Sequence, residues 1–165
     1  MAFPAPFTST IRKVEAQWVD YNGHMNMAYY NVLFNHAIDE VFALVGLDPE
    51  YVKATGCSFF TLEVHVTYVR ELHAGDAVRT AVQFLDHDAK RVHYVQQMFH
   101  AAEGWLACVS EDIVMHVDLA AKKSSPFPAD VLEKIMAMHE AHRHLPVPSQ
   151  VGHKIGIPRK QPGAA

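Results

Sequence analysis

The sequence predicts an α+β fold in which a five-stranded antiparallel sheet is wrapped around one long central helix. Two observations indicate this fold: a strongly apolar helical pattern at residues 27–45, and four strand-like runs after it that are separated by short polar turns. The chain has 165 residues, half of them hydrophobic, which suits one buried core and is too short for two ordinary domains. We therefore expect one domain spanning 1–165, with its core at about 11–118 and a C-terminal helix and irregular tail at about 126–165.

The composition argues against several classes of partner. A net charge of -4 leaves no basic field to attract nucleic acid or anionic lipid, and no run approaches the ~20 apolar residues that cross a bilayer. Prolines interrupt the apolar start of the chain, which is unlike a secretory signal. The two cysteines, Cys57 and Cys108, lie far apart and form no C-x-x-C pair. We therefore expect a cytoplasmic protein that binds neither nucleic acid nor membrane and needs no cofactor.

The first elements are a strand and the central helix. Residues 11–19 alternate loosely between polar and apolar and end at Asp20, which is typical of a strand. From Met27 to Val45 the apolar residues recur at helical spacing; Asn26 is a suitable N-cap, and Gly46 suits the left-handed position that ends a helix. Further apolar residues widen the stripe and predict that the helix is largely enclosed; they are Ala28, Val32, Phe42 and Ala43.

Four strands follow a loop around residues 48–56. The runs are 58–70, 78–86, 91–101 and 105–117, and the short polar breaks between them favour antiparallel hairpins. Glu111 and Asp112 interrupt the last run, so we expect a bulge or an end of pairing there. After Pro126 and Pro128, residues 131–142 form an amphipathic helical pattern, and the prolines and glycines beyond it predict an irregular tail.

Twelve histidines raise the question of a metal site. The densest cluster is His139, His142 and His144, which reads H-E-x-H-x-H and not the H-E-x-x-H of a helical zinc site. It lies on a polar stretch, so we interpret it as a solvated helix end and expect no metal.

The segment W-V-D-Y-N-G-H-M-N-M-A-Y-Y, residues 18–30, is the candidate functional segment. It combines a carboxylate, a glycine turn and a capped helix start. The first amides of a helix carry a partial positive charge, so a carbonyl oxygen placed there is polarised, and Asp20 lies close enough in sequence to attack that carbonyl or to deprotonate a water. The alternative is structural: Asp20 and Asn22 make an Asx turn over which His24 packs.

The spacing of Asp20, Gly23, His24 and Asn26 resembles the D-x-x-G-H-x-N signature of the 4-hydroxybenzoyl-CoA thioesterase family of hotdog proteins. The similarity covers roughly residues 11–117. It implies a hotdog fold and an enzyme, an acyl-CoA thioesterase, in which Asp20 is the catalytic carboxylate and the backbone amide of Met27 polarises the thioester carbonyl. Gly23 then allows the close turn, while His24 and Asn26 shape the loop and cap the helix.

The resemblance also implies the partners. Basic residues near a later hairpin are expected to bind CoA, which makes Lys90 and Arg91 candidates, with Lys122 and Lys123 as weaker ones. Two chains are expected to join their sheets edge to edge as a homodimer or homotetramer. Two alternatives stay open: a hotdog hydratase or dehydratase, and a non-catalytic acyl-CoA-binding module.

A narrower resemblance concerns the acyl group. Residues 18–30 together with 145–158 are similar to the thioesterase domains fused to L-carnitine dehydrogenases and to the betainyl-CoA thioesterases of carnitine breakdown. This implies a small trimethylammonium acyl group, released as glycine betaine. Aromatic rings near the motif are candidates for enclosing that cation, although each is also a candidate for the core: Trp18, Tyr21, Tyr30, Phe34 and Phe60, with Tyr29 and Phe59 beside them.

Overall fold

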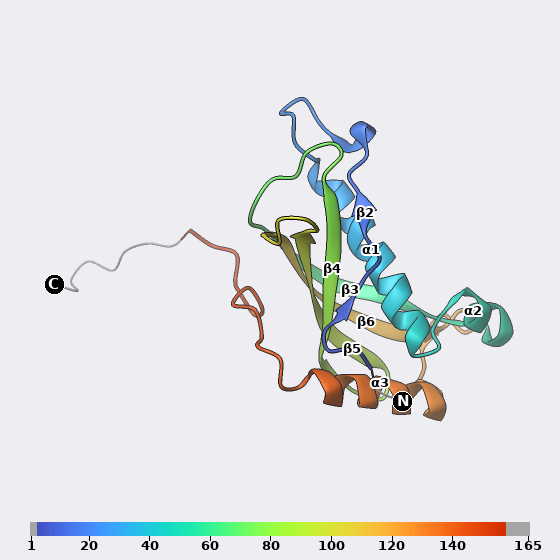
Figure 1. Ribbon diagram of the computed structural model, residues 1–165. Coiled ribbons are helices and arrows are strands. Elements are labelled where there is room, and N and C mark those ends of the chain that lie inside the picture. The colour runs from blue at the N-terminus through green and yellow to red at the C-terminus, as the bar shows by residue number, and fades with distance from the viewer. Residues whose placement is uncertain (1–2, 158–165) are drawn as a thin grey trace.

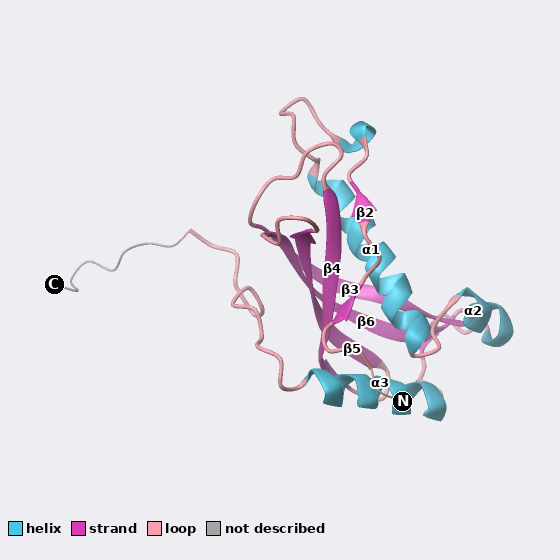
Figure 2. Cartoon of the chain, viewed as in Figure 1, coloured by secondary structure: helices cyan, strands magenta, loops and turns pink. Residues whose placement is uncertain are grey.

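The computed structural model describes residues 3–157. A strongly twisted antiparallel sheet carries α1 along one face, α3 crosses one end of the sheet, and the C-terminal segment runs along the side away from α1 (Figures 1 and 2). The helices are α1 (Met27–Leu44), α2 (Pro49–Thr55) and α3 (Ala129–His142), with a 3-10 turn at Ala16–Trp18. The strands are β1 (Phe7–Thr8), β2 (Arg12–Lys13), β3 (Cys57–Tyr68), β4 (Ala77–His87), β5 (Arg91–His100), β6 (Leu106–Asp118) and β7 (Lys123–Ser124).

Helix α1 confirms the predicted central helix to within a residue at its end. The side chain of Asn26 caps it by accepting a hydrogen bond from the amide of Ala28 at 3.0 Å, and Gly46 follows with a φ of +91°. The expectation of a largely enclosed helix is wrong for this chain, because Ala28, Val32 and Ala43 are exposed. The buried stripe is the narrower one of a helix lying on a sheet: Tyr30, Leu33, Phe34, Ala37, Ile38, Val41 and Phe42.

The sheet runs in the order β1-β4-β5-β6-β3, while β2 pairs with β4 and β7 with β6. Its four long strands confirm the four predicted runs. The predicted strand at 11–19 is wrong except at Arg12–Lys13, because the chain turns away from β4: the amide of Val14 bonds to Asp76, and that of Trp18 to Glu15.

Two other details of the prediction are corrected. Strand β6 pairs without a break through Glu111 and Asp112, because the buried carboxylate of Asp112 accepts a hydrogen bond from Ser110; the register shifts instead in β3, between Thr61 and Glu63. The loop expected at 48–56 contains α2, which Asp48 caps through the amide of Tyr51.

The core under α1 is divided into two apolar clusters. One surrounds Phe42 and Tyr94, and the other surrounds Phe34 and Met98. Between them, side chains of the three central strands on the α1 side of the sheet form a buried polar band, which consists of Thr80, Gln96, Ser110 and Asp112. Burial raises the pKa of Asp112 to about 6. The side-chain oxygen of Gln96 is buried and has no hydrogen-bond partner among residues 3–157.

The end of α3 is packed rather than solvated, which corrects the expectation for His142. Its Nδ1 accepts a hydrogen bond from the amide of Phe84 at 2.9 Å, and its Nε2 donates to the carbonyl of Pro4 at 2.8 Å. Burial lowers the pKa of His142, which favours this neutral tautomer. The ring of His139 contacts that of His87. Across the described part of the chain, no cluster of three or more potential ligands is arranged to hold a metal ion. No helix of residues 3–157 has the length and apolar content to cross a membrane.

The predicted irregular tail is confirmed over residues 143–157, which contain no helix or strand. The remainder of the predicted tail, with Pro158, lies outside the described residues.

Candidate active site

The loop before α1 folds back on itself. Val19 and Met25 form an isolated antiparallel bridge, and the amide of Asn26 bonds to the carbonyl of Trp18 at 2.9 Å. The chain reverses between them at Gly23, whose φ of +81° lies in the left-handed region that favours glycine. The loop thus places Asp20 next to the residues that precede the helix, and the amide of Asp20 bonds to the carbonyl of His24 at 3.1 Å.

Asp20 lies at the base of this loop. Its Oδ1 accepts a hydrogen bond from the amide of Asn22 at 2.8 Å, and its carbonyl accepts from Gly23 at 3.0 Å, so the Asx turn is present. The Oδ2 atom has no hydrogen-bond partner among the described residues. The ring of His24 stands edge-on to His73, 5.1 Å between centroids, and does not take part in the Asx turn. The turn therefore holds one carboxylate oxygen and leaves the other available for chemistry.

The first turn of α1 supplies an unused donor. The amide of Ala28 is occupied by the Asn26 cap, but within residues 3–157 no acceptor lies on the amide of Met27. This donor is at the positive end of an 18-residue helix. Such an amide can polarise a carbonyl oxygen and stabilise the oxyanion that forms when the carbonyl is attacked.

A cavity of about 290 Å³ opens beside this helix start, lined by Met25, Met27, Tyr30, Tyr68, Val69, Arg70 and Glu71. The hydroxyl of Tyr68 donates to the carbonyl of Met27 at 3.3 Å, and the rings of Tyr68 and Tyr30 meet edge to face at 5.1 Å. Burial raises the pKa of Tyr30 to about 12, while a hydrogen bond from its own backbone amide lowers the pKa of Glu71. Asp20 is not in the lining; its loop reaches the cavity through Met25.

Tyr68 and Glu71 were missed by the reasoning from sequence, which looked for the site near residues 18–30. Their signal was present only indirectly: Tyr68 ends β3, Glu71 follows it by three residues, and this end of β3 lies beside Met27.

The five aromatic residues predicted to contact substrate lie in different surroundings. Tyr30 lines the cavity. Trp18 stacks on Tyr29 with centroids 5.4 Å apart, and Phe34 is buried in the same apolar cluster. Tyr21 is 97% exposed on the loop. Phe60 points to the sheet face away from α1, because its neighbour Phe59 stacks on Phe42 of α1. The structure therefore brings only Tyr30 of this set to the cavity.

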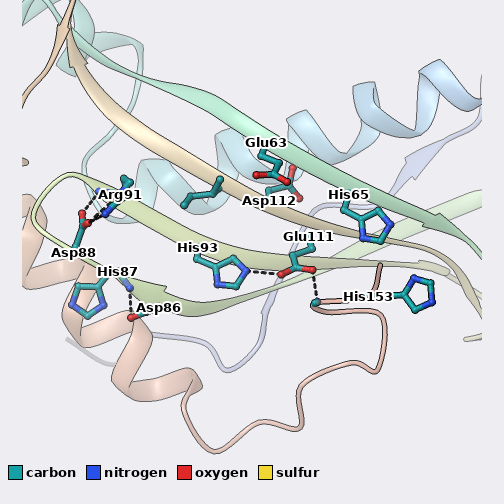
Figure 3. Close-up of a pocket in the computed structure, with 12 residues that line it drawn as sticks. Glu63, His65, Asp86, His87, Asp88, Arg91, His93, Glu111, Asp112 and His153 are labelled. Carbon is teal, nitrogen blue, oxygen red and sulfur yellow. Dashed lines mark hydrogen bonds and ion pairs between the residues drawn. The ribbon is translucent and has the colours of Figure 1, made fainter. Parts of the chain in front are cut away.

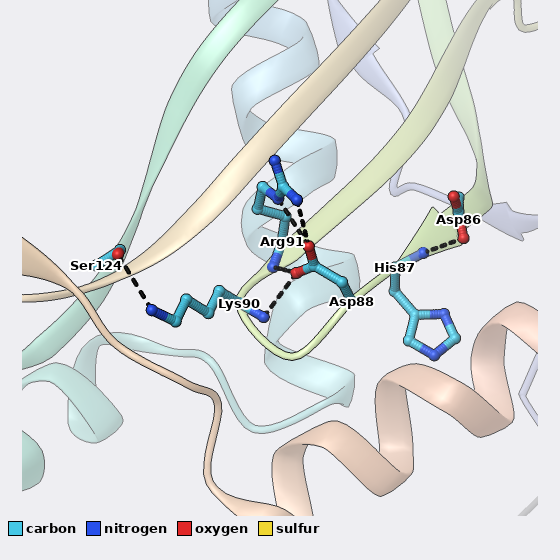
Figure 4. A network of polar contacts seen from close by, with 6 residues as sticks. All are labelled: Asp86, His87, Asp88, Lys90, Arg91 and Ser124. Carbon is cyan, nitrogen blue, oxygen red and sulfur yellow. Dashed lines mark hydrogen bonds and ion pairs between the residues drawn. The ribbon is translucent and has the colours of Figure 1, made fainter.

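The predicted CoA ligands, Lys90 and Arg91, lie at the turn between β4 and β5 (Figure 4). Arg91 donates through Nε to Oδ2 of Asp88 at 2.8 Å, and Nζ of Lys90 approaches the hydroxyl of Ser124 at 3.5 Å. On β6, the partner of Tyr68 is Cys108 and that of Arg91 is Met115, seven residues further on. At ~3.3 Å per residue that separation is about 23 Å. Their role with CoA stays a prediction.

A larger cavity of about 530 Å³ lies on the sheet face away from α1, between the strands and the C-terminal tail (Figure 3). Glu111 links its walls: Oε1 meets Nε2 of His93 at 2.9 Å, and Oε2 accepts from the amide of Gly152 at 2.7 Å. Carboxylates dominate the lining, with Glu63, Asp86, Asp88 and Glu111 against Arg91 alone among lysines and arginines. This charge balance repels polyanions such as CoA, so the cavity beside α1 is the stronger candidate for catalysis.

Known proteins are similar to this chain along most of its length. A family model described as the thioesterase-like superfamily matches residues 14–135. A betainyl-CoA thioesterase of Pseudomonas aeruginosa is 42% identical over 142 residues, which cover 86% of this chain and 89% of that protein. The L-carnitine dehydrogenase/betainyl-CoA thioesterase of Rhizobium meliloti is 39% identical over 147 residues, which cover 89% of this chain but 29% of that protein. The predicted resemblance to these enzymes is thereby confirmed.

The fold has close counterparts among solved structures. A Staphylococcus aureus protein characterised in complex with CoA superimposes with a TM-score of 0.86 and 29% identity, covering 96% of this chain and all of that chain. This likeness, together with the observed sheet and central helix, confirms the predicted hotdog fold.

Proposed function

This chain belongs to the thioesterase-like superfamily, and we propose that it hydrolyses acyl-CoA thioesters to a free acid and CoA. The observation that carries the proposal is the amide of Met27 at the positive start of α1, which has no acceptor among residues 3–157 and lies beside a small cavity and the Asp20 loop. The thioester carbonyl oxygen accepts a hydrogen bond from this amide. Asp20 either takes a proton from the attacking water and passes it to the CoA thiolate as that leaves, or attacks the carbonyl carbon itself. Direct attack expels the CoA thiolate and forms an anhydride, which water hydrolyses to the free acid while its proton goes to the thiolate.

The acyl group is betaine in this proposal, so that the products are glycine betaine and CoA. The identity of 42% to a betainyl-CoA thioesterase over 89% of that protein supports this substrate. A cavity of about 290 Å³ suits a small acyl group better than a long chain. The free thiols of Cys57 and Cys108 fit a cytoplasmic setting, where CoA thioesters occur.

The test is release of free CoA thiol from a panel of acyl-CoA thioesters. Betainyl-CoA is expected to have the highest kcat/KM, ahead of acetyl-CoA, a long-chain acyl-CoA and an aromatic acyl-CoA. A panel in which no thioester is cleaved above the rate in water would overturn the assignment as a hydrolase, and a preference for the aromatic compound would overturn betaine.

The working unit in this proposal is a homodimer, alone or within a homotetramer. Strand β3 ends the sheet, and its apolar side chains are strongly exposed, with Leu62 at 50% and Val64 at 42%. A free 12-residue edge of this kind offers its unpaired backbone groups to another strand, and a second β3 fits it. Sedimentation is expected to give a dimer or a multiple of one, and a fully active monomer would refute the arrangement.

A further inference from the structure

The chemistry of a betainyl thioester places strict limits on where its cation binds. The quaternary nitrogen is joined to the carbonyl carbon through a single CH₂ group, which sets the two atoms about 2.5 Å apart. A carbonyl oxygen on the amide of Met27 therefore brings the three methyl groups to the residues that border the first turn of α1. Rings elsewhere in the fold cannot contact this cation while the carbonyl is on Met27.

Tyr68 has the position that this geometry demands. Its hydroxyl bonds to the carbonyl of Met27, which fixes the ring beside the first turn, and the residue, which lines the cavity, is 45% exposed. Tyr30 meets it edge to face and makes the adjoining wall, but only 3% of Tyr30 is exposed. The half-exposed face of Tyr68 is thus the aromatic surface that a ligand can reach.

Two charged residues, Arg70 and Glu71, also line this cavity, and their side chains make different contacts. The guanidinium of Arg70 lies over the ring of Trp105, 4.1 Å from its centroid, so its charge is engaged by that ring. Glu71 has no salt-bridge partner within 4.0 Å among the described residues. The lining thus combines aromatic faces, two methionines, the carboxylate of Glu71 and the guanidinium of Arg70, which is stacked on Trp105. The aromatic faces and the carboxylate are groups that attract a methylated cation.

We propose that Tyr68 and Glu71 are the specificity-determining residues of this site, with the ring of Tyr68 contacting the trimethylammonium group and the carboxylate of Glu71 attracting it. The inference rests on the proposed hydrolysis of betainyl-CoA. It adds two residues that select the positively charged acyl group over a neutral one of the same shape.

The experiment compares betainyl-CoA with 3,3-dimethylbutyryl-CoA, in which carbon replaces the quaternary nitrogen, in the wild type and four variants. Tyr68→Leu is expected to lower kcat/KM for betainyl-CoA by about tenfold or more and to change that for the neutral compound by less than about threefold. Tyr68→Phe keeps the ring and is expected to keep the preference. Glu71→Gln is expected to reduce the preference severalfold, and less so in high salt, because the carboxylate is exposed. Glu133→Gln, an exposed residue of α3, is the matched control.

The outcomes separate this inference from the proposed function. If the wild type cleaves neither thioester, the proposed hydrolysis fails. If the wild type cleaves both but shows no preference for betainyl-CoA, or if Tyr68→Leu lowers both rates equally, the thioesterase stands and the cation site is wrong. If Glu71→Gln and Glu133→Gln prefer betainyl-CoA over the neutral compound to the same extent, Glu71 is not part of the cation site.

Discussion

The side-chain oxygen of Asn26 accepts a hydrogen bond from the amide of Ala28 at 3.0 Å, while the neighbouring amide of Met27 has no acceptor within the described structure. The cap thus satisfies the amide of Ala28 and leaves the amide before it, which binds the thioester carbonyl in the proposed function. Variants at this helix end can therefore separate stability from the proposed catalytic role.

Asn26→Ala is expected to lower the free energy of unfolding by about 1 kcal/mol, as for other lost N-caps, and also to lower kcat, because the first turn is no longer held. Asp48→Ala is the matched control, since Asp48 caps α2 through the amide of Tyr51 at 2.8 Å. It is expected to cost similar stability and to leave kcat within about twofold. Urea unfolding and thiol release measure the two quantities, and equal losses of kcat in both variants would contradict the assignment.

Asp20→Asn is expected to lower kcat by at least about a hundredfold with little change in KM or stability. The amide is nearly isosteric and its oxygen can still accept from Asn22, so the Asx turn is retained. Steady-state kinetics and a thermal melt make the comparison. Turnover within a few-fold of the wild type would show that Asp20 has only the structural role.

Asp112→Asn is expected to change how stability depends on pH. The folded-state pKa of Asp112 is about 6, above the 3.8 of a free carboxyl, so the folded state holds this proton more tightly than the unfolded state does. The protonated Asp112 therefore contributes its full stabilisation below about pH 4. This stabilisation is roughly 3 kcal/mol, at 1.36 kcal/mol per pKa unit, and it is lost as the pH rises to about 6.

Asparagine has no proton to lose, and its amide can donate to the unpaired side-chain oxygen of Gln96. The variant is therefore expected to be more stable than the wild type at pH 7.5 and nearly equal at pH 4. Urea unfolding at the two pH values checks this. A variant less stable than the wild type at pH 7.5 would mean that the charged carboxylate is favoured in the fold.

Glu111→Ala is expected to release the C-terminal segment from the sheet, because the carboxylate binds both the amide of Gly152 and the ring of His93. Hydrogen exchange at Gly152 is expected to accelerate by at least about tenfold, which matches the loss of a bond to a charged group. Betainyl-CoA hydrolysis is expected to stay within about twofold of the wild type. A large loss of activity would move the active site to the cavity on that face of the sheet.

The sequence predicted best those features that depend on local interactions. The bounds of α1 followed from its apolar spacing, the Asn26 cap and Gly46, which act within a few residues of one another. The predicted strand at 11–19 failed because strands depend on partners, and β4 pairs with only two of its residues. For α2 the local signals were present in Asp48, Pro49 and Gly56, but its seven residues are too few for a helical period to stand out.

For the same reason, only the local part of the candidate site could be recognised from the sequence. Asp20, Gly23 and Asn26 lie in one short segment and could be recognised together. Tyr68 is 41 residues from Met27 in sequence, and their contact depends on the register of β3 against β6. Sequence periodicity does not determine that register to the single residue.

The contact between His142 and the carbonyl of Pro4 affects the order in which contacts can form while the chain is being synthesised. The two residues are 138 positions apart, so the ribosome releases nearly the whole chain before Pro4 can make this contact, whereas Phe7 and Thr8 need only β4 for their pairing. Until then the amide of Phe84, which also bonds to His142, lacks its acceptor at the end of the sheet. A nascent chain stopped before α3 therefore lacks this anchor at Pro4, and its first segment can be held only through the pairing of β1 and β2 with β4.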